Sequence, residues 1–470
     1  ENAELRAMVT ELRAMVVQLQ RRNKRQTAPF SKGPPKPDPK KPGRKPGDAY
    51  GKKGHREPPR PEDVEAKETY DAPLPDACPD CGHDGIQFDR TVPKWEQEII
   101  RKTVWRLFNV PIGFCEACGR RVQGRHPKQG SDALGAAASG VGPEAHAMMT
   151  LLNKEMGLSH GKVVRFMACA YGLVLTRGAS VHSVLRTGRR CLPAYRQILR
   201  VVRRSLWVVP DETGWRVAAI LHWLWAFVTA QATAYTIRRG RGYEEASEVL
   251  GADYDGNMTH DGHKSYDKFR HAIHGQCNGH FLDRCKRLLL VARRGSVRFP
   301  RAVKALLKGG LSLRDRHADG EVSAHGLDVA RGKLQRRLDR LLEAPKRDPE
   351  NERFRKHLDR HRDEIFTYLR FPGMDATNWK AEQAIRPAVV NRKVWGGNRT
   401  QRGAQAQEVL MSVLRTCVQQ GKDAMDFLVQ VLCTPGRSPP PLVIPARIAA
   451  RSYRTPLALP APACAATAGG

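Results

Sequence analysis

The sequence predicts a multidomain α+β protein, and three observations support that fold class. The chain has 470 residues, enough for two or three domains that each bury a core. Hydrophobic residues make up 40% of it, which is low for one compact globule and indicates that some segments are non-globular. Apolar residues recur at helical spacing over residues 129–204, but from residue 206 they form short runs rich in β-branched and aromatic side chains.

The charge of the chain indicates a nucleic-acid partner. Lys and Arg number 80 against 48 Asp and Glu, which leaves a formal net charge of +32. Self-repulsion on this scale destabilises a compact state unless a polyanion neutralises it. No segment has the roughly 18 consecutive apolar residues of a membrane helix, and no signal peptide is recognisable. We therefore expect a cytoplasmic protein, in a reducing compartment where cysteine pairs hold metal more often than they form disulfides.

Both ends of the chain are expected to lie outside the globular part. Residues 1–25 predict a helix with an apolar stripe at heptad spacing, which forms either a short dimerising coiled coil or a helix docked on its own core. Residues 26–70 form a basic, Pro-rich linker in which Arg44 and Lys45 are candidate phosphate contacts, although a solvated linker explains the same composition. Residues 431–470 are rich in Pro and Ala and predict a disordered tail.

Two cysteine pairs predict a zinc-binding region over residues 71–128. Each pair is a C-x-x-C-G knuckle, formed by Cys78 with Cys81 and by Cys115 with Cys118. Four thiolates bind Zn²⁺ tetrahedrally and leave no open position, so a single structural zinc is expected. The gap between the pairs exceeds the roughly 15–20 residues usual in zinc ribbons, and a long hairpin over residues 91–109 would account for it. Redox dithiols or unrelated core cysteines are the alternatives.

The remaining segments predict a helical DNA-binding region over 129–204 and an α/β domain over 205–430. Strands are expected at 206–211, continuing at 215–218 after a break, and then at 222–229, 232–238, 258–261 and 273–277. A helix is expected between the third and fourth strands, at 243–250, and another from residue 280. Three antiparallel strands, a helix, a strand, a helix and a further strand is the RNase H-like order. The basic stretch at about 290–372 predicts a helical insertion, with helices at 331–342 and 353–369.

Two carboxylates of this α/β domain are candidates for binding catalytic metal. Asp211 directly follows a buried strand, where a charge is expensive unless it is paired or binds metal, and Asp261 ends a later strand. In the RNase H-like order these two strands are neighbours. Glu382 begins a helix after the insertion, while Glu212 and Asp375 are rivals by position alone. Phosphodiester cleavage and joining by two Mg²⁺ ions needs such hard oxygen ligands.

Several segments resemble the insertion-sequence sixty-six family of bacterial transposases. They are, in chain order, Pro210-Asp-Glu-Thr-Gly-Trp-Arg-Val217, His222-Trp-Leu-Trp-Ala-Phe-Val-Thr229, Asp261-Gly262 with Tyr266, Cys277 to Arg284 with His280 between, Thr377-Asn-Trp-Lys-Ala-Glu-Gln-Ala-Ile-Arg-Pro387 and Arg392-Lys-Val-Trp395. The paired cysteines, the leading helix and the basic linker also fit this family. The resemblance covers roughly residues 1–430. Departures are Trp379 in place of a second Asn, Gln383 in place of Arg, and the apolar turn after Val217.

The resemblance implies a DDE transposase that acts on the ends of a bacterial insertion sequence and on target DNA. Asp211, Asp261 and Glu382 would hold two Mg²⁺ or Mn²⁺ ions. Arg386, Arg392 and Lys393 are candidate phosphate contacts, and His280 is a candidate accessory residue. A homodimer or larger assembly near the nucleoid and accessory proteins encoded by the same element are the expected partners. Two alternatives stay open: a non-catalytic zinc-containing DNA-binding protein descended from a transposase, and an RNase H-like nuclease that cuts without joining.

Overall fold

The computed structural model describes residues 69–92, 94, 99, 101, 103–135, 140–292, 294–371 and 373–434. The predicted coiled coil, most of the basic linker with Arg44 and Lys45, and the tail from residue 435 lie outside this description. The chain divides into two compact units, residues 1–100 and 101–470, and the fold below is that of the second unit. Within the described part, no helix is long and apolar enough to span a membrane.

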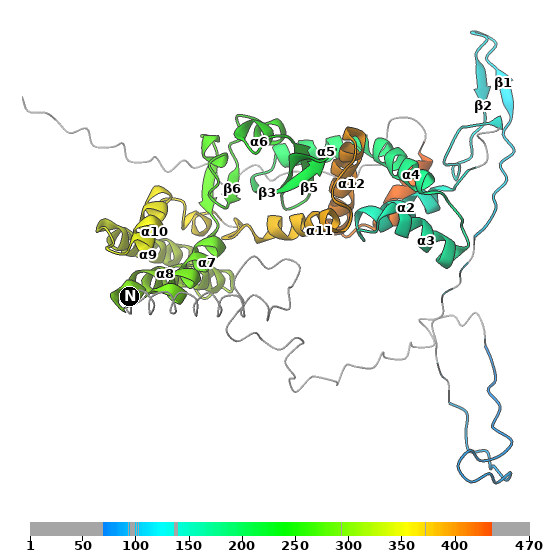
Figure 1. Ribbon diagram of the computed structural model, residues 1–470, viewed down its shortest axis with the longest axis horizontal. Helices are drawn as coiled ribbons and strands as arrows, with labels where there is room; N and C mark the ends of the chain where they lie inside the picture. Colours follow the sequence, from blue (N-terminus) through cyan, green and yellow to red (C-terminus); the bar gives the residue numbers. More distant parts are fainter. Residues whose placement is uncertain are drawn as a thin grey trace, which may run out of the picture. The chain divides into compact units, whose positions relative to one another are not determined.

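A five-stranded mixed sheet forms the centre of this unit (Figure 1). Strands β3 (Trp207–Val217), β4 (Ile220–Val228) and β5 (Thr233–Arg238) are antiparallel. Strand β6 (Asn257–His260) pairs in parallel with β3, and β7 (Ile273–Gln276) pairs in parallel with β6. The resulting order, β5-β4-β3-β6-β7, makes the first and fourth strands neighbours, as the sequence predicts, and is consistent with an RNase H-like core.

The first strand is continuous, so the predicted break at Asp211 is wrong. Strand β4 pairs with β3 at every position from Val209↔Val228 to Val217↔Ile220. The polar residues in the middle do not interrupt the strand because their side chains have partners. Glu212 forms an ion pair with Arg241, and the Thr213 hydroxyl accepts a hydrogen bond from Arg392.

The β3–β4 hairpin turns through two alanines in a left-handed conformation. Ala218 and Ala219 have φ angles of 49° and 64°, where a side chain costs about 1–2 kcal/mol. The turn is held from outside. The Ala218 N–H donates to the Asn398 carbonyl at 2.8 Å, and the Asn398 N–H donates to the Arg216 carbonyl at 2.9 Å. These two bonds account for the tolerance of an apolar turn where glycine or asparagine is the rule.

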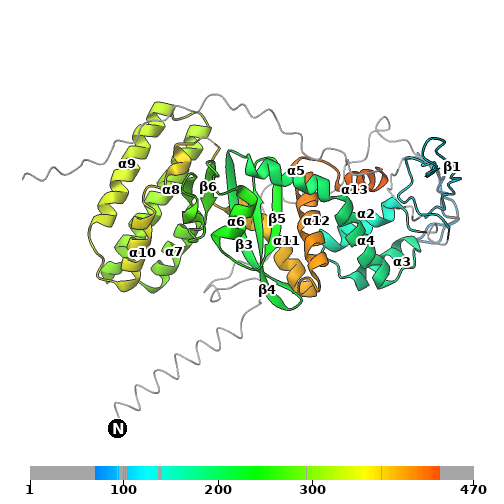
Figure 2. The same cartoon turned by 90° about the horizontal axis from the view of Figure 1, so that it is seen from above.

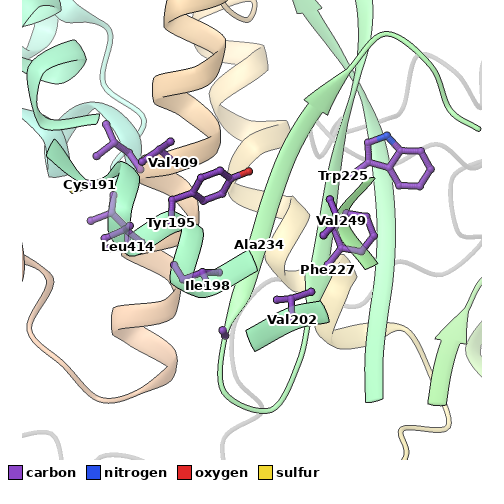
Figure 3. Close-up of a cluster of buried hydrophobic side chains, with 14 of the residues drawn as sticks. Cys191, Tyr195, Ile198, Val202, Trp225, Phe227, Ala234, Val249, Val409 and Leu414 are labelled. Carbon is purple, nitrogen blue, oxygen red and sulfur yellow. The ribbon is translucent and has the colours of Figure 1, made fainter. Parts of the chain in front are cut away.

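Both faces of the sheet are buried, which explains the nearly continuous apolar runs of its strands. Trp225 and Phe227 of β4 pack on one face with helices α5 (Leu192–Arg203), α6 (Tyr243–Leu250) and α13 (Ala424–Cys433), as Figure 3 shows in part. The alternate residues Leu224, Ala226 and Val228 pack on the other face against helix α11 (Trp379–Trp395). This alternation decides which face each polar residue of β3 occupies.

Helix α12 (Gln401–Gln419) covers the outer edge of the sheet. Three of its side chains accept hydrogen bonds from alternate backbone N–H groups of β5: Thr416 from Thr233 at 3.2 Å, Ser412 from Tyr235 at 2.8 Å and Glu408 from Ile237 at 2.7 Å. A free strand edge is a site for unwanted pairing with other chains. On α12, polar residues repeated every four positions accept the free N–H groups of β5, so this edge is not available for pairing with another strand.

The predicted helical region before the sheet consists of α2 (Pro143–Lys154), α3 (His160–Tyr171), α4 (Arg177–Arg190) and α5. Helices α2 and α3 share a small core built from Met149, Leu152, Val163 and Met167. Helices α2 and α4 also pack against α12 and α13 (Figure 2). The region is therefore part of the same unit as the sheet.

The segment between β7 and α11 in the sequence forms a second hydrophobic core. It is formed by α7 (Asn278–Val291), α8 (Arg298–Ala318), α9 (Ala324–Glu343), α10 (Pro349–Arg360) and the short helix η4 (Thr367–Leu369). The predicted helix over 353–369 is wrong in its second half, because α10 ends at Arg360. The chain folds back there so that the Glu364 carbonyl can accept the Gln276 N–H of β7 at 3.2 Å.

Candidate active site

Asp211 lies in the middle of β3, on the face that α11 covers. Alternation along the strand places it with Val209 and Trp215, which pack against that helix. Its Oδ1 accepts the Glu212 backbone N–H at 2.9 Å. Burial, followed by repulsion from Glu212, Asp261 and Glu382, raises the pKa of Asp211 to about 7.

Asp261 directly follows β6, beside Asp211. The parallel pairing of β3 with β6 matches Val208 with Met258, and Asp211 and Asp261 each come three residues later. The Asp261 Oδ1 accepts the His263 backbone N–H at 3.0 Å, which fixes the carboxylate in the turn after the strand. The neighbouring His260 is fully buried, and burial lowers the pKa of this imidazole to about 3.

Glu382 approaches from a third element, the first turn of α11. Its helix neighbours Ala381, Ala384 and Ile385 are buried against the sheet, whereas half of the Glu382 side chain is exposed. The His280 Nε2 lies 3.8 Å from the Glu382 Oε1. A hydrogen bond with Cys277, and then the charges of Asp261 and Glu382, outweigh burial and raise the pKa of His280 to about 9. The predicted accessory histidine is therefore cationic beside these acids.

The structure brings the three predicted carboxylates into one electrostatic cluster. Asp261 and Glu382, from two other elements, both contribute to the raised pKa of Asp211. Across the residues that the structure describes, no group of three or more His, Cys, Asp or Glu side chains is close enough to hold a metal ion together. The three carboxylates therefore interact electrostatically, but in the described part of the chain they do not form a group that could hold a metal ion.

The two rival acids are occupied elsewhere. The Glu212 side chain is 1% exposed and leaves β3 on the opposite face from Asp211, where it pairs with Arg241 at 2.6 Å. Its other oxygen accepts the Tyr266 hydroxyl at 2.7 Å. Asp375 forms an ion pair with Lys380 at 3.0 Å. Strand alternation was the signal that separates Glu212 from Asp211, and it is readable from the sequence once the strand is known to be continuous.

The candidate phosphate contacts differ in their surroundings. Arg386 and Lys393 are exposed on α11, on the same helix as Glu382. Arg392 is partly buried, its guanidinium lies 3.5 Å from the Thr213 hydroxyl, and burial lowers its pKa. Trp379, the first residue of α11, is 59% exposed and lies one helical turn before Glu382.

The two cysteine knuckles have the same turn geometry, each within its own unit. In the first, the Gly82 N–H donates to the Cys78 carbonyl at 2.8 Å and Gly82 has a φ of 75°. In the second, the Gly119 N–H donates to the Cys115 carbonyl at 2.8 Å and Gly119 has a φ of 67°. Backbone hydrogen bonds lower the pKa of Cys78 and of Cys115, which favours the thiolates that zinc requires.

The strands near these knuckles are not those predicted. No strand is assigned to any described residue between 91 and 109, where a long hairpin is expected. A short hairpin of β1 (Ile112–Phe114) and β2 (Arg121–Gln123) instead encloses the second knuckle. The tight C-x-x-C-G turn itself joins these strands, so alternation in the preceding segment was a misleading signal.

Asn378 is a residue of the site that the sequence pattern did not single out. It immediately precedes α11, and its side chain does not cap that helix. Instead its Oδ1 accepts the Cys277 thiol at 3.1 Å. An Asn directly before a predicted helix indicates a cap, so the usual interpretation of this pattern would have concealed the contact.

The family model described as Transposase IS66 family matches residues 140–406, more than half of the chain. The matched segment runs from the helices before the sheet into α12 and includes Asp211, Asp261 and Glu382. A search of the curated proteins found no match.

Proposed function

The chain belongs to the IS66 family of transposases, and from that premise we propose that it is the catalytic transposase of a bacterial insertion sequence. In this proposal it cuts DNA strands at the ends of the element and joins them to target DNA through Asp211, Asp261 and Glu382. The observation that carries the proposal is the placement of the acids: Asp211 and Asp261 each lie three residues beyond the paired residues Val208 and Met258, and Glu382 lies on α11, which packs on the face of the sheet that Asp211 occupies. The raised pKa of Asp211, to which Asp261 and Glu382 contribute, agrees with this placement. Three acids from three elements repel one another here, at a stability cost that a cation would remove.

The donor set fits divalent Mg²⁺ or Mn²⁺. Oxygen ligands suit these ions, and Mg²⁺ binds through one or two carboxylates while it retains waters and takes substrate phosphates. When bound, a pair of such ions would activate the attacking oxygen and stabilise the leaving oxygen.

The protein's own residues then have distinct roles. Asp211 and Asp261 are held by the sheet and by backbone N–H groups, so they define a fixed side of the site. Glu382 is half exposed and supplies the third carboxylate from α11. Arg386, Lys393 and, more weakly, the partly buried Arg392 would hold DNA phosphates along α11. We extend this role to Arg44, Lys45 and the helical region 129–204, since the net charge of +32 calls for an extended polyanion.

The partners of the protein belong to the same proposal. We propose that the N-terminal helix pairs two protomers, and that proteins from the same element assist the reaction. The four cysteines of the two knuckles would bind one structural Zn²⁺, and the support for this is the matching geometry of the two turns. Zinc analysis of purified protein tests this assignment. About one Zn²⁺ per chain is expected in the wild type and in the control Cys285→Ser, and less in Cys78→Ser.

A strand-cleavage and strand-joining assay with element-end DNA and Mg²⁺ tests the catalytic proposal. Asp211→Asn, Asp261→Asn and Glu382→Gln should each lower both rates at least about 1,000-fold, because lost metal stabilisation is worth several kcal/mol. DNA binding in a gel-shift assay should be retained. Asp375→Asn is the matched control, since this nearby acid pairs with Lys380, and it should stay active.

The same assay separates the alternatives. If the wild-type protein binds DNA but neither cuts nor joins it, the non-catalytic regulator is correct. Cleavage without any new 3′–5′ joint identifies a nuclease. Wild-type rates in Asp211→Asn would show that the acids have been misassigned.

A further inference from the structure

The thiol of Cys277 occupies the junction between two of the three acidic elements. Cys277 follows β7, precedes the first residue of α7 and is 3% exposed. Its Sγ–H donates to the Asn378 Oδ1 at 3.1 Å, and the Asn378 backbone N–H donates to the Sγ at 3.3 Å. One side chain thus makes two hydrogen bonds, in opposite directions, to one residue.

Asn378 controls the start of the helix that bears Glu382. The backbone N–H groups of Ala381 and Glu382 both donate to the Asn378 carbonyl, at 2.9 and 3.1 Å. A displacement of Asn378 would therefore move the first turn of α11 and the Glu382 backbone with it. Because helix ends fray unless their backbone groups are held, this turn depends on what fixes Asn378.

The backbone of Cys277 holds the other acid. Its N–H donates to the carbonyl of His260 at 2.8 Å, and His260 is the residue directly before Asp261. Cys277 consequently contacts the end of the Asp261 strand through its main chain and the start of the Glu382 helix through its side chain. Two further bonds support the same approach of the segments: the Thr259 hydroxyl to the Asp375 carbonyl, and the Asn278 N–H to the Ala376 carbonyl, both at 2.9 Å.

We propose that Cys277 is a positioning residue that sets the separation of Asp261 and Glu382, and hence the affinity of the site for divalent metal. This inference rests on the proposed function. The residue acts through its hydrogen bonds, because its buried Sγ is shared with the Oδ1 and the backbone N–H of Asn378. A thiol suits the position because it both donates and accepts, and serine is the one smaller residue that retains both capacities.

Binding of Mn²⁺ to the full-length protein, measured by titration calorimetry, tests the inference. Cys277→Ala should bind Mn²⁺ about 10–100-fold more weakly, the usual effect of losing a residue that orients metal ligands. Cys277→Ser should remain within about threefold of the wild type, since the hydroxyl can make both hydrogen bonds. Cys285→Ala is the matched control, because Cys285 is a fully buried thiol on the same helix that packs in the insertion core.

Hydrogen exchange of the metal-free protein supplies a second, independent measurement. Peptides covering residues 375–385 should exchange faster in Cys277→Ala than in the wild type or in Cys285→Ala, because the first turn of α11 loses its anchor. Equal Mn²⁺ affinity in Cys277→Ala and the wild type would overturn the inference, as would equal weakening in Cys285→Ala. If the wild type binds no Mn²⁺, the proposed function fails, and unchanged exchange over 375–385 would overturn the positioning role separately.

Discussion

Asp211 and Glu212 are adjacent carboxylates on β3 that differ in their surroundings because successive side chains leave a strand on opposite faces. Glu212 is buried in an ion pair with Arg241 and a hydrogen bond from Tyr266. Asp211 has no such cation and instead meets the fields of Asp261 and Glu382. One carboxylate therefore stabilises the fold, while the negative charge of the other lowers its stability.

Substitution of the two residues should change stability in opposite directions. The raised pKa of Asp211 means that the folded state holds a proton which the unfolded state releases above about pH 4. Between about pH 4 and pH 7, the stability of the metal-free wild type should fall relative to that of Asp211→Asn, by at most about 1.4 kcal/mol per pH unit. Urea denaturation with a chelator at pH 5 and pH 8 measures this difference.

Glu212→Gln is the opposing case. It leaves Arg241, whose side chain is 38% exposed, without its carboxylate partner, and it weakens a buried hydrogen-bond network, so the free energy of unfolding should fall by about 1–3 kcal/mol. If Glu212→Gln is as stable as the wild type, the buried ion pair does not have the role given to it here. A greater loss of stability in Asp211→Asn than in Glu212→Gln would contradict both assignments.

The assignment of Asp211, Asp261 and Glu382 as the acids of the site is a prediction from strand positions and from a resemblance. Their environments could not be predicted from the sequence. The hydrogen bonds of Cys277 and Asn378 join positions 101 residues apart, and no local pattern encodes such a contact. The cationic state of His280 likewise depends on neighbours from several elements.

At the scale of elements, side chains of α12 accept the edge N–H groups of β5 that a sixth strand would otherwise bind. Its Glu408, Ser412 and Thr416 lie at successive intervals of four and satisfy alternate N–H groups of β5. The helical period of 3.6 residues at 1.5 Å rise and the two-residue repeat of a strand bring these groups into register. A fully buried polar stripe of this kind specifies one position of the helix along the strand.

Ser412→Ala should show the value of that stripe. It removes the acceptor of the Tyr235 N–H and leaves a buried donor unpaired, which costs about 1–3 kcal/mol. The midpoint of urea denaturation should fall with no change in its slope. Ser180→Ala, at an equally buried serine on α4 whose hydroxyl meets His160, provides the comparison. An unchanged midpoint in Ser412→Ala would mean that the β5 edge is satisfied in another way.

Element types were predictable where periodicity was strong, as in α3, α6 and the five strands. The errors arose where tertiary contacts override local preference. Strand β3 continues through Asp211 because β4 pairs with every residue from Val209 to Val217 and the buried Glu212 carboxylate pairs with Arg241. Helix α10 ends at Arg360 because β7 recruits the Glu364 carbonyl. Neither partner is close in sequence to the residue that it affects.

At the scale of the whole molecule, Lys154 joins the helices before the sheet to those after it. This residue ends α2, is 5% exposed and donates to the Gln407 Oε1 of α12 at 2.6 Å. Its ammonium also lies 5.2 Å from the centre of the Trp395 ring of α11, and its carbonyl accepts from Asn391. Burial without a carboxylate partner lowers the pKa of Lys154 to about 7.

Lys154 should therefore contribute a rise in stability with pH above neutrality. Between about pH 7 and pH 10 the unfolded state binds the Lys154 proton more tightly than the folded state does, so this group favours folding as the pH rises. The slope of stability against pH should be more positive in the wild type than in Lys154→Met by up to about 1.4 kcal/mol per pH unit, while His280, whose pKa is raised, acts in the opposite direction in both proteins. Lys308→Met, at an exposed lysine of α8, should retain the wild-type slope. Parallel pH profiles for wild type and Lys154→Met would contradict the burial of this charge.

The organisation of the molecule was only partly predictable. Charge indicated a polyanion partner, and composition separated the terminal segments from the globular part. The packing of α2 and α4 against α12 and α13 was not foreseen, because it joins helices that are more than 200 residues apart. Buried Lys154 is the residue that marks this junction, and a lysine at the end of a helix normally indicates a solvated terminus.

The most direct measurement is anomalous diffraction from crystals of the protein with element-end DNA and Mn²⁺. The account predicts Mn²⁺ peaks bounded by the carboxylates of Asp211, Asp261 and Glu382, with Glu212 still paired with Arg241. Ordered DNA with no Mn²⁺ at these three carboxylates, or with Mn²⁺ bound elsewhere, would contradict the catalytic assignment.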